Sequence, residues 1–237
     1  MVKKIHRFIT DFTNNAGIVM VADQSVIHQI NRVLKLHPGE QVIIGKGDGL
    51  EILAKIVKTR KEAIYFEPQQ NVKNENEPVR RVTLYCSILK KENFETAAQK
   101  ATEVGVFKMV PIISQRTVKT DIKPERLKNI IKEASEQSGR GIVPELGEIL
   151  VLEEALNIAK ENNAAIFLEP SGTDFLQLGK KIKTVSVFIG PEGGWTDEEI
   201  SMAKKAGFKV VSLWPLIMKA ETVVAVASYL VIHSPID

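Results

Sequence analysis

The C-terminal two thirds of the sequence alternate short apolar runs with helical patterns, and this alternation constrains the fold more than any other feature. The runs "AAIFLEP", "VSVFIGPEGG" and "FKVVSLWP" are short and mostly apolar, as in strands that are buried on both faces. Other segments, such as "KENFETAAQKATEVG" and "KPERLKNIIKEASEQSG", repeat apolar residues at steps of three and four, which is typical of helices. Strands that alternate with helices predict an open α/β sheet.

The first 70 residues follow a different pattern. Several short strand patterns, one amphipathic helix in "DQSVIHQINRVLKL" with Asp23 as its N-cap, and the hairpin signal "GDG" at 47–49 predict a small β-barrel. The polar, asparagine-rich segment "QQNVKNENEP" that follows is typical of a linker. We therefore expect a barrel over residues 1–70, a linker over 71–79 and an α/β domain over 80–237.

Composition argues against several classes of protein. The 237 residues contain no run near the roughly 20 apolar residues of a membrane span. The start "MVKKIHRFITDF" lacks the apolar core of a signal peptide, so we expect a cytoplasmic protein that does not contact a membrane. A single cysteine, Cys86, and four scattered histidines offer no ligand spacing for a metal. The net charge of +3 is only a mild indication of an anionic partner.

In open α/β sheets, ligands bind beyond the carboxyl ends of the strands. Three segments follow predicted strands and are therefore candidates for a binding site: "FLEP" at 167–170, "IGPEGG" at 189–194 and "LWPLIMKAET" at 213–222. The glycines of the second segment can take unusual backbone angles and let a ligand come close.

The residues after this glycine loop argue against a phosphate ligand. In "TDEE", Thr196 and Glu199 have the spacing of a capping box, and two further carboxylates occupy the first helical turn. These negative charges already complement the positive end of the helix, and the loop lacks the signatures of phosphate and dinucleotide sites. A loop for a ligand without phosphates fits better, and a turn that needs glycines only for its geometry is the alternative.

Four blocks in order make the sequence recognisable: "QKATEVGVFKMVPIIS", "KEASEQSGRGIVPEL", "IGPEGGWTDEEI" and "LWPLIMKAETVVAVAS". Together they resemble the RsmE family of the SPOUT superfamily, whose members methylate N3 of a uridine in small-subunit (16S) ribosomal RNA. The resemblance continues in "HRFI" and "INRVLKLHPGEQV", so it spans nearly the whole chain.

The resemblance implies a PUA-like RNA-binding β-barrel, followed by an α/β methyltransferase domain with a C-terminal trefoil knot. It further implies S-adenosylmethionine as cofactor, ribosomal RNA or the assembled small subunit as partner, and a homodimer. The cofactor carries no phosphate, in agreement with the acidic helix start. The final segment "AETVVAVASYLVI" is apolar nearly all round, as in a helix that is buried or packs on a second subunit.

The same resemblance assigns cofactor contacts to residues that follow three predicted strands. They are Leu168, Glu169, Ile189, Gly190, Pro191, Glu192, Gly193, Gly194, Leu213, Trp214, Pro215, Ile217, Met218 and Thr222. The last block departs from the family pattern, because Trp214 stands in place of a glycine, and Leu216 and Lys219 stand in place of arginines. These departures leave two alternatives open: an RNA-binding module with weak or no catalysis, and the same chemistry at a different RNA site.

Methyl transfer to uridine requires alignment of the two reactants and loss of the N3 proton. We expect Lys219, with Arg140 as a second candidate, to stabilise the developing uridine anion. Glu221 or Glu103 is expected to accept the proton. The alternatives are a structural ion pair between Lys219 and Glu221, and a helix N-terminal role for Glu221.

The expected RNA contacts are basic or polar residues from both domains. They are His6, Arg7, Lys90, Arg116, Gln137, Ser138 and Arg140. Basic side chains that neutralise phosphates make binding strongly dependent on salt. A solvated surface charge is the alternative for each basic residue.

Overall fold

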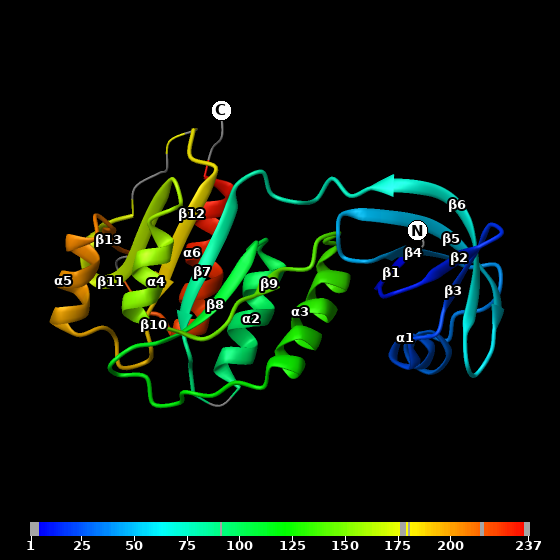
Figure 1. Cartoon of the computed structure of the whole chain (residues 1–237), viewed down its shortest axis with the longest axis horizontal. Coiled ribbons are helices and arrows are strands. Elements are labelled where there is room, and N and C mark those ends of the chain that lie inside the picture. The colour runs from blue at the N-terminus through cyan, green and yellow to red at the C-terminus, as the bar shows by residue number, and fades with distance from the viewer. Residues whose placement is uncertain (1–4, 91, 176–178, 180, 214–215, 235–237) are drawn as a thin grey trace. The chain divides into compact units, whose positions relative to one another are not determined.

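The chain folds into two compact units in the computed structural model (Figure 1). The structure describes residues 5–90, 92–175, 179, 181–213 and 216–234. The first unit consists of Met1–Glu77 and Ser135–Val143, and the second of Pro78–Ala134 and Pro144–Asp237.

The first unit is built on a six-stranded sheet with the order β1-β4-β5-β6-β3-β2. Its strands are β1 (His6–Ile9), β2 (Thr13–Asn15), β3 (Ile18–Val21), β4 (Gln41–Gly45), β5 (Leu50–Thr59) and β6 (Ile64–Lys73). β1 and β4 are parallel, and the other neighbours are antiparallel. The glycines of the predicted hairpin, Gly47 and Gly49, have positive φ angles between β4 and β5, which confirms this turn.

The predicted first helix begins as expected but changes its winding. Asp23 accepts a hydrogen bond from the amide of Ser25 at 2.8 Å, so it is the N-cap. The helix runs as α1 (Gln24–His28) and continues as the π-helical turn η1 (Gln29–Val33). Its inner side, including Ile30, packs on buried residues of the sheet such as Phe8 and Phe66.

Two boundaries differ from the sequence-based expectation. β6 reaches Lys73, so the first residues of the expected linker continue a strand. Residues 135–143, which were expected within the α/β domain, belong to the first unit. The backbone explains this placement: the amide of Val143 donates to the carbonyl of Gly47, and the amide of Gly49 donates to the carbonyl of Gly141.

The second unit contains a seven-stranded sheet with the order β10-β8-β7-β12-β11-β13, in which β9 also pairs with β8. Its strands are β7 (Arg81–Ser87), β8 (Lys108–Ile113), β9 (Glu145–Leu146), β10 (Leu150–Val151), β11 (Ala164–Asp174), β12 (Thr184–Ile189) and β13 (Lys209–Ser212). All of these pairs are parallel, which confirms the predicted α/β class. Because every strand points the same way, their carboxyl ends meet along one edge.

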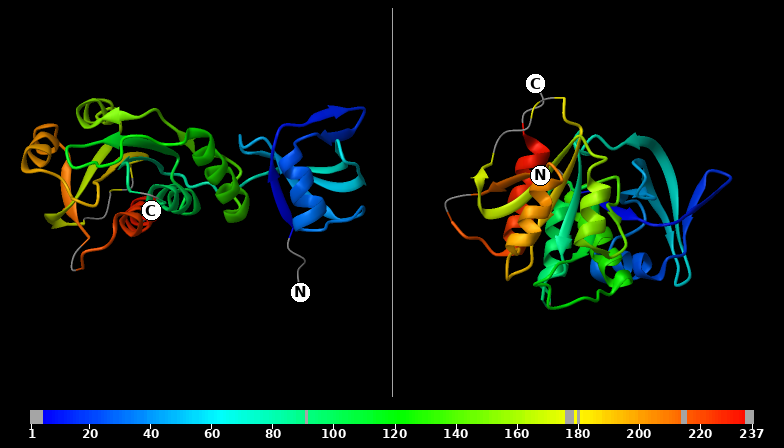
Figure 2. Two further views of the ribbon diagram at one scale, coloured as in Figure 1. Left: turned by 90° about the horizontal axis from the view of Figure 1, so that it is seen from below. Right: turned by 60° about the vertical axis from the view of Figure 1, so that its left-hand side comes forward.

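Helices cover both faces of this sheet (Figure 2). They are α2 (Asn93–Glu103), α3 (Pro124–Ser138), α4 (Leu152–Ala159), α5 (Asp197–Lys205) and α6 (Ala220–His233). α4 and α5 lie on one face, while α2 and α6 lie on the other. α6 buries Val224, Ala227 and Val231, but leaves Tyr229 and Leu230 exposed. Within the described part of the chain, no helix has the length and apolar character that a membrane span requires.

Candidate functional site

A cavity of about 500 Å³ opens beyond the carboxyl ends of β11, β12 and β13. Three stretches of the chain supply most of its lining: 168–170 after the first part of β11, 189–195 after β12, and 212–213 with 216–223 after β13. These are the three segments that the strand pattern singled out. They meet because β12, β11 and β13 are neighbours in the sheet.

Most of the residues expected to hold a cofactor line this cavity. They are Leu168, Glu169, Ile189, Gly190, Pro191, Glu192, Gly194, Leu213, Ile217 and Met218. Gly193 and Thr222 are not part of the lining, although their neighbours are. Trp214 and Pro215 lie outside the described residues.

A bulge in β11 brings its middle residues to the cavity. Leu168 and Thr173 both pair with Val211 of β13, so the four residues between them leave the ladder. The returning strand passes close to β13 at Gly172, where a Cβ atom would lie 2.6 Å from the Val211 backbone. Only glycine fits there, and the bulge places Glu169 and Pro170 in the cavity wall.

Trp195 is the main wall residue that the sequence analysis missed. Its indole Nε1 donates to the buried carbonyl of Leu168 at 2.9 Å, and its ring lies 4.4 Å from that of Phe167. A Cβ atom on Gly190 would be only 2.9 Å from the indole, so glycine is required there to make room for it. Trp195 thereby joins the loop after β12 to the end of β11.

A sequence signal for Trp195 did exist. It occupies the position before the N-cap Thr196, and Ile200 stands at the fourth position of the helix. Apolar residues at these two positions form a hydrophobic staple. Trp195 belongs to a buried cluster and the partly buried Ile200 packs against the same cluster, so the staple fixes how the chain enters α5.

The start of α5 is satisfied by the protein's own groups. Thr196 Oγ1 accepts from the amide of Glu199, and the Glu199 carboxylate accepts from the amides of Thr196 and Gln115. These contacts confirm the predicted capping box. Hydrogen bonds from its own backbone amide and from Thr196, with a smaller effect of the nearby Arg116 charge, lower the pKa of Glu198. The helix end therefore already carries negative charge, which disfavours a phosphate beside it.

Lys219 and Glu221 lie together in the cavity lining, where α6 begins. Lys219 occupies the N-cap position with an exposed side chain, and Glu221 is half-buried in the first turn. Both side chains lie in the described part of the chain, and they do not form an ion pair with each other. Glu103 is not in the lining and instead pairs with Lys100 at 2.9 Å. The geometry therefore brings Lys219 and Glu221 to the cavity and leaves Glu103 out.

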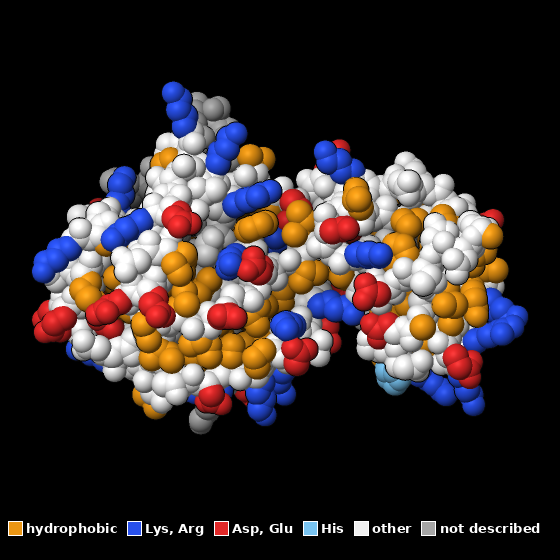
Figure 3. Space-filling model, viewed as in Figure 1, with side chains coloured by type: hydrophobic (Ala, Val, Ile, Leu, Met, Phe, Trp, Pro, Cys, Tyr) orange, Lys and Arg blue, Asp and Glu red, His pale blue; other side chains and the backbone are white. Residues whose placement is uncertain are grey.

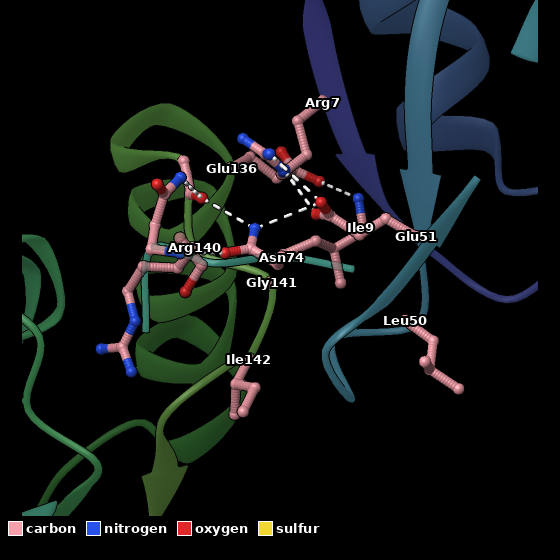
Figure 4. A network of polar contacts seen from close by, with 12 residues as sticks. Arg7, Ile9, Leu50, Glu51, Asn74, Glu136, Arg140, Gly141 and Ile142 are labelled. Atoms are coloured by element: carbon pink, nitrogen blue, oxygen red, sulfur yellow. Dashed lines mark hydrogen bonds and ion pairs between the residues drawn. The ribbon is translucent and has the colours of Figure 1, made fainter. Parts of the chain in front are cut away.

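The guanidinium of Arg7, an expected RNA contact, pairs with a carboxylate of the first unit (Figure 4). Its Nε lies 2.6 Å from Glu51 Oε1, and the Glu51 side chain is only 2% exposed. Asn74 donates to the other Glu51 oxygen and to the carbonyl of Gly139. Arg7 thus neutralises a buried carboxylate of the protein itself.

Arg140, like Arg7, pairs with a carboxylate of the first unit, and it does not line the cavity. Its Nη2 lies 2.8 Å from Glu77, and its side chain is 5% exposed. Glu77 also accepts hydrogen bonds from the amides of Gly141 and Ile142. The guanidinium is buried in the first unit and paired with Glu77, so the residues around it show a structural ion pair.

The remaining expected RNA contacts are accessible to different degrees. Lys90, Arg116, Gln137 and Ser138 are exposed, and His6 is half-buried. On the face shown in Figure 3, basic and acidic side chains are interspersed on both units, without one continuous basic surface. Within the described ranges, no three or more histidine, cysteine, aspartate or glutamate side chains cluster as metal ligands would.

A parallel sheet with a ligand-sized cavity at its carboxyl edge is the arrangement expected of an α/β enzyme. Residues 75–232 match the RNA methyltransferase domain family, which defines the class of the protein. The chain belongs to the family of ribosomal RNA small subunit methyltransferase E. The member from Aquifex aeolicus is 35% identical over 161 residues, which cover 65% of this chain and 69% of the relative. The member from Mesomycoplasma hyopneumoniae is 30% identical over 158 residues, covering 65% and 70%.

Two solved structures are similar over nearly the whole chain. Ribosomal RNA small subunit methyltransferase E from Neisseria gonorrhoeae, bound to S-adenosyl methionine, has a TM-score of 0.87 and 28% identity, with 95% of each chain covered. A putative methyltransferase from Legionella pneumophila, in complex with the same cofactor, has a TM-score of 0.86 and 26% identity, with 96% of this chain and 97% of the other covered.

Proposed function

We propose that the protein is an S-adenosylmethionine-dependent methyltransferase that acts in the cytoplasm on N3 of a uridine in 16S ribosomal RNA. The observation that carries this proposal is the cavity at the carboxyl ends of β11, β12 and β13. Its volume of about 500 Å³ falls in the range typical of small-molecule sites. Family membership and the two cofactor-bound relatives support the same activity.

The chain's own residues fit this cofactor. Apolar side chains such as Leu168, Ile189 and Leu213 suit an adenine ring, and the backbone of the glycine loop offers amides and carbonyls at close range. The carboxylates at the start of α5 would repel a nucleotide phosphate but not an adenosine joined to methionine. When bound, the cofactor supplies the electrophilic methyl group.

Lys219 and Glu221 are the residues to which we assign the chemistry on the uridine. The Lys219 ammonium would stabilise negative charge that develops on the base as N3 loses its proton. The Glu221 carboxylate would accept that proton, directly or through water. Both line the cavity at the start of α6, which supports roles at one reaction centre.

Replacing Lys219 tests this assignment. Lys219→Ala is expected to lower kcat for methylation of small subunits by about 10²- to 10³-fold, the usual loss when one stabilising group is removed. Lys219→Arg keeps the positive charge and should recover part of the rate. The control is Lys204→Ala, which removes an exposed charge at the end of α5. Unchanged turnover in Lys219→Ala would remove Lys219 from the mechanism.

The activity itself is tested in two steps. Calorimetric titration of the purified protein with S-adenosylmethionine should show binding at one site per chain. Mapping of modified uridines in 16S ribosomal RNA from a deletion strain should then show loss of one N3 methyl group. Cofactor binding without loss of a uridine mark would indicate a different RNA site. Absence of cofactor binding would indicate an RNA-binding module without catalysis.

We further propose that the first unit is a PUA-like barrel and that the chain after β13 passes through a trefoil knot. The support for a knot is topological: β13 lies at the edge of the sheet, yet α6 packs on β7 and β12 nearer its middle. An experimental structure traced through residues 213–219 would test the knot.

If the first unit holds RNA, replacing its exposed basic side chains should weaken RNA binding and reduce the dependence of that binding on salt.

The homodimer is a proposal that rests on α6. Tyr229 is 54% exposed and Leu230 is 39% exposed on a mostly apolar helix, as expected for a surface that a second subunit covers. Sedimentation equilibrium should give twice the mass of the chain. Tyr229→Glu should shift the protein toward monomer, and a native protein that sediments as a monomer would contradict the proposal.

A further inference from the structure

The glycine loop after β12 is held from two directions by hydrogen bonds. On one side, the amide of Lys90 donates to the carboxylate of Glu192 at 2.8 Å. On the other side, Arg116, which follows β8, reaches the loop with its guanidinium. The loop conformation therefore depends on segments that come from the neighbouring part of the sheet.

Arg116 makes two hydrogen bonds from one nitrogen. Its Nη1 donates to the carbonyl of Gly193 at 2.8 Å and to the carbonyl of Trp195 at 3.0 Å. Its aliphatic stem runs along Gly193, where a Cβ atom would come within 3.4 Å of Arg116 Cβ. The guanidinium therefore holds the peptide groups that follow Gly193 and Trp195, and the stem packs along Gly193.

The segment that carries Arg116 is itself well anchored. The amide of Ser114 donates to Thr117 Oγ1 at 2.9 Å, and the amide of Gln115 donates to Glu199 at 2.8 Å. Arg116 therefore projects from a turn that is tied to α5 as well as to β8. Because the backbone of this turn is already ordered, holding the loop costs mainly the rotamer freedom of the Arg116 side chain.

We propose that Arg116 is a positioning residue for the cofactor loop and not an RNA contact. It acts through Trp195, whose indole holds the Leu168 carbonyl in the cavity wall, and through the peptide of Gly193 beside Gly194. Arg116 itself is not part of the cavity lining. The inference deepens the proposed function, since it takes the cavity to be the S-adenosylmethionine site.

The local charge also disfavours a phosphate at Arg116. The guanidinium is close enough to Glu198 to help lower the pKa of that carboxylate. Asp197 and Glu199 occupy the same helical turn. An RNA phosphate would have to approach this acidic helix start, whereas carbonyl groups of the loop bind the guanidinium without like-charge repulsion.

The proposal is tested with Arg116→Ala and Arg116→Lys. The control is Lys123→Ala, which removes an exposed positive charge from the same connection between β8 and α3. Three quantities are measured for each variant: the Kd for S-adenosylmethionine, the salt dependence of binding to 16S ribosomal RNA, and hydrogen exchange of the amides of residues 193–196 in the protein without cofactor.

For Arg116→Ala we expect a Kd for the cofactor that rises about 10- to 100-fold, because two charge-assisted hydrogen bonds are lost. Hydrogen exchange in the loop should be faster, while the slope of RNA affinity against salt should equal that of the wild type. Arg116→Lys should fall between the two, because an ammonium keeps the charge but lacks the planar guanidinium. Lys123→Ala should leave the cofactor Kd and loop exchange unchanged.

Two results would overturn the inference. One is a salt slope that falls by about 0.7 to 0.9, the value for one lost phosphate contact, with cofactor affinity unchanged. The other is unchanged loop exchange in both Arg116 variants. If the wild type binds no cofactor, the proposed function fails, but exchange in the cofactor-free protein still decides the role of Arg116. Thermal midpoints of all variants identify any general loss of folding, and Arg116→Lys replaces Arg116→Ala if the alanine variant does not fold.

Discussion

The contact between Trp195 and the Leu168 carbonyl gives the sharpest prediction about the cavity wall. Trp195→Phe removes the Nε1–H donor, so the buried carbonyl of Leu168 loses this hydrogen bond at a cost of about 1–3 kcal/mol. The smaller ring also leaves a gap beside Gly190 and Phe167, which adds roughly 1 kcal/mol for a void of ~40 Å³. The free energy of unfolding should therefore fall by about 2–4 kcal/mol. For a chain of this length the thermal midpoint should drop by roughly 4–16 °C.

The same change should weaken cofactor binding, because the wall of the cavity loses its link between β11 and the glycine loop. The control is Phe208→Leu, in the same buried cluster but outside the cavity lining. Scanning calorimetry should show a lower midpoint for both variants, while titration with S-adenosylmethionine should show weaker binding only for Trp195→Phe. Equal cofactor affinity in the two variants would refute the idea that the indole positions the wall. An unchanged midpoint in Trp195→Phe would refute the hydrogen bond as a stabilising contact.

Three further outcomes follow from particular contacts. Gly190→Ala should raise the cofactor Kd at least about tenfold in a titration, because the added Cβ would sit 2.9 Å from the indole. Gly207→Ala adds a Cβ with no atom within 4 Å, so urea unfolding should show only about 1 kcal/mol of backbone strain. Arg140→Met should lower the free energy of unfolding by about 3–5 kcal/mol, because it leaves the Glu77 carboxylate without its positively charged partner. Adding Glu77→Gln should restore part of this free energy, and a double variant with no recovery would contradict the pairing. Burial, with a smaller effect of the Glu192 charge, raises the pKa of Cys86 far above its usual value. The unfolded thiol therefore ionises first, so stability should fall as pH rises above about 8.5; Cys86→Ala should remove this dependence, and a native thiol that reacts readily with disulfide reagents at pH 8 would contradict it.

The sequence predicted the features that depend on neighbouring residues. Apolar runs alternating with helical patterns predicted a parallel sheet, and Thr196 with Glu199 predicted the start of α5. The three segments that follow predicted strands line the cavity, as the rule that ligands bind beyond strand ends predicts. Each of these signals lies within a few residues or follows from the direction of the strands.

The features that escaped prediction depend on residues far apart in the chain. Arg7 and Glu51 are 44 positions apart, and Arg140 and Glu77 are 63 apart. An arginine that neutralises a buried carboxylate and one that meets RNA look alike in sequence, because only the tertiary partner distinguishes them. The bulge of β11 was hidden for the same reason, since the need for Gly172 arises from the backbone of Val211.

The first unit is built from two separate segments of the chain, and this affects the order in which the chain can fold during synthesis. Its sheet ends at Lys73, but Asn74 and Glu77 bind the backbone of residues 139–142, which are made more than sixty positions later. Until then the Glu77 carboxylate lacks the charge of Arg140. The first unit is therefore completed only after α2, β8 and most of α3 have been synthesised, although domains commonly fold in order from the N-terminus. A fragment that stops at residue 77 should be less stable than the same segment in the whole chain, and a separate peptide of residues 135–143 should bind to it.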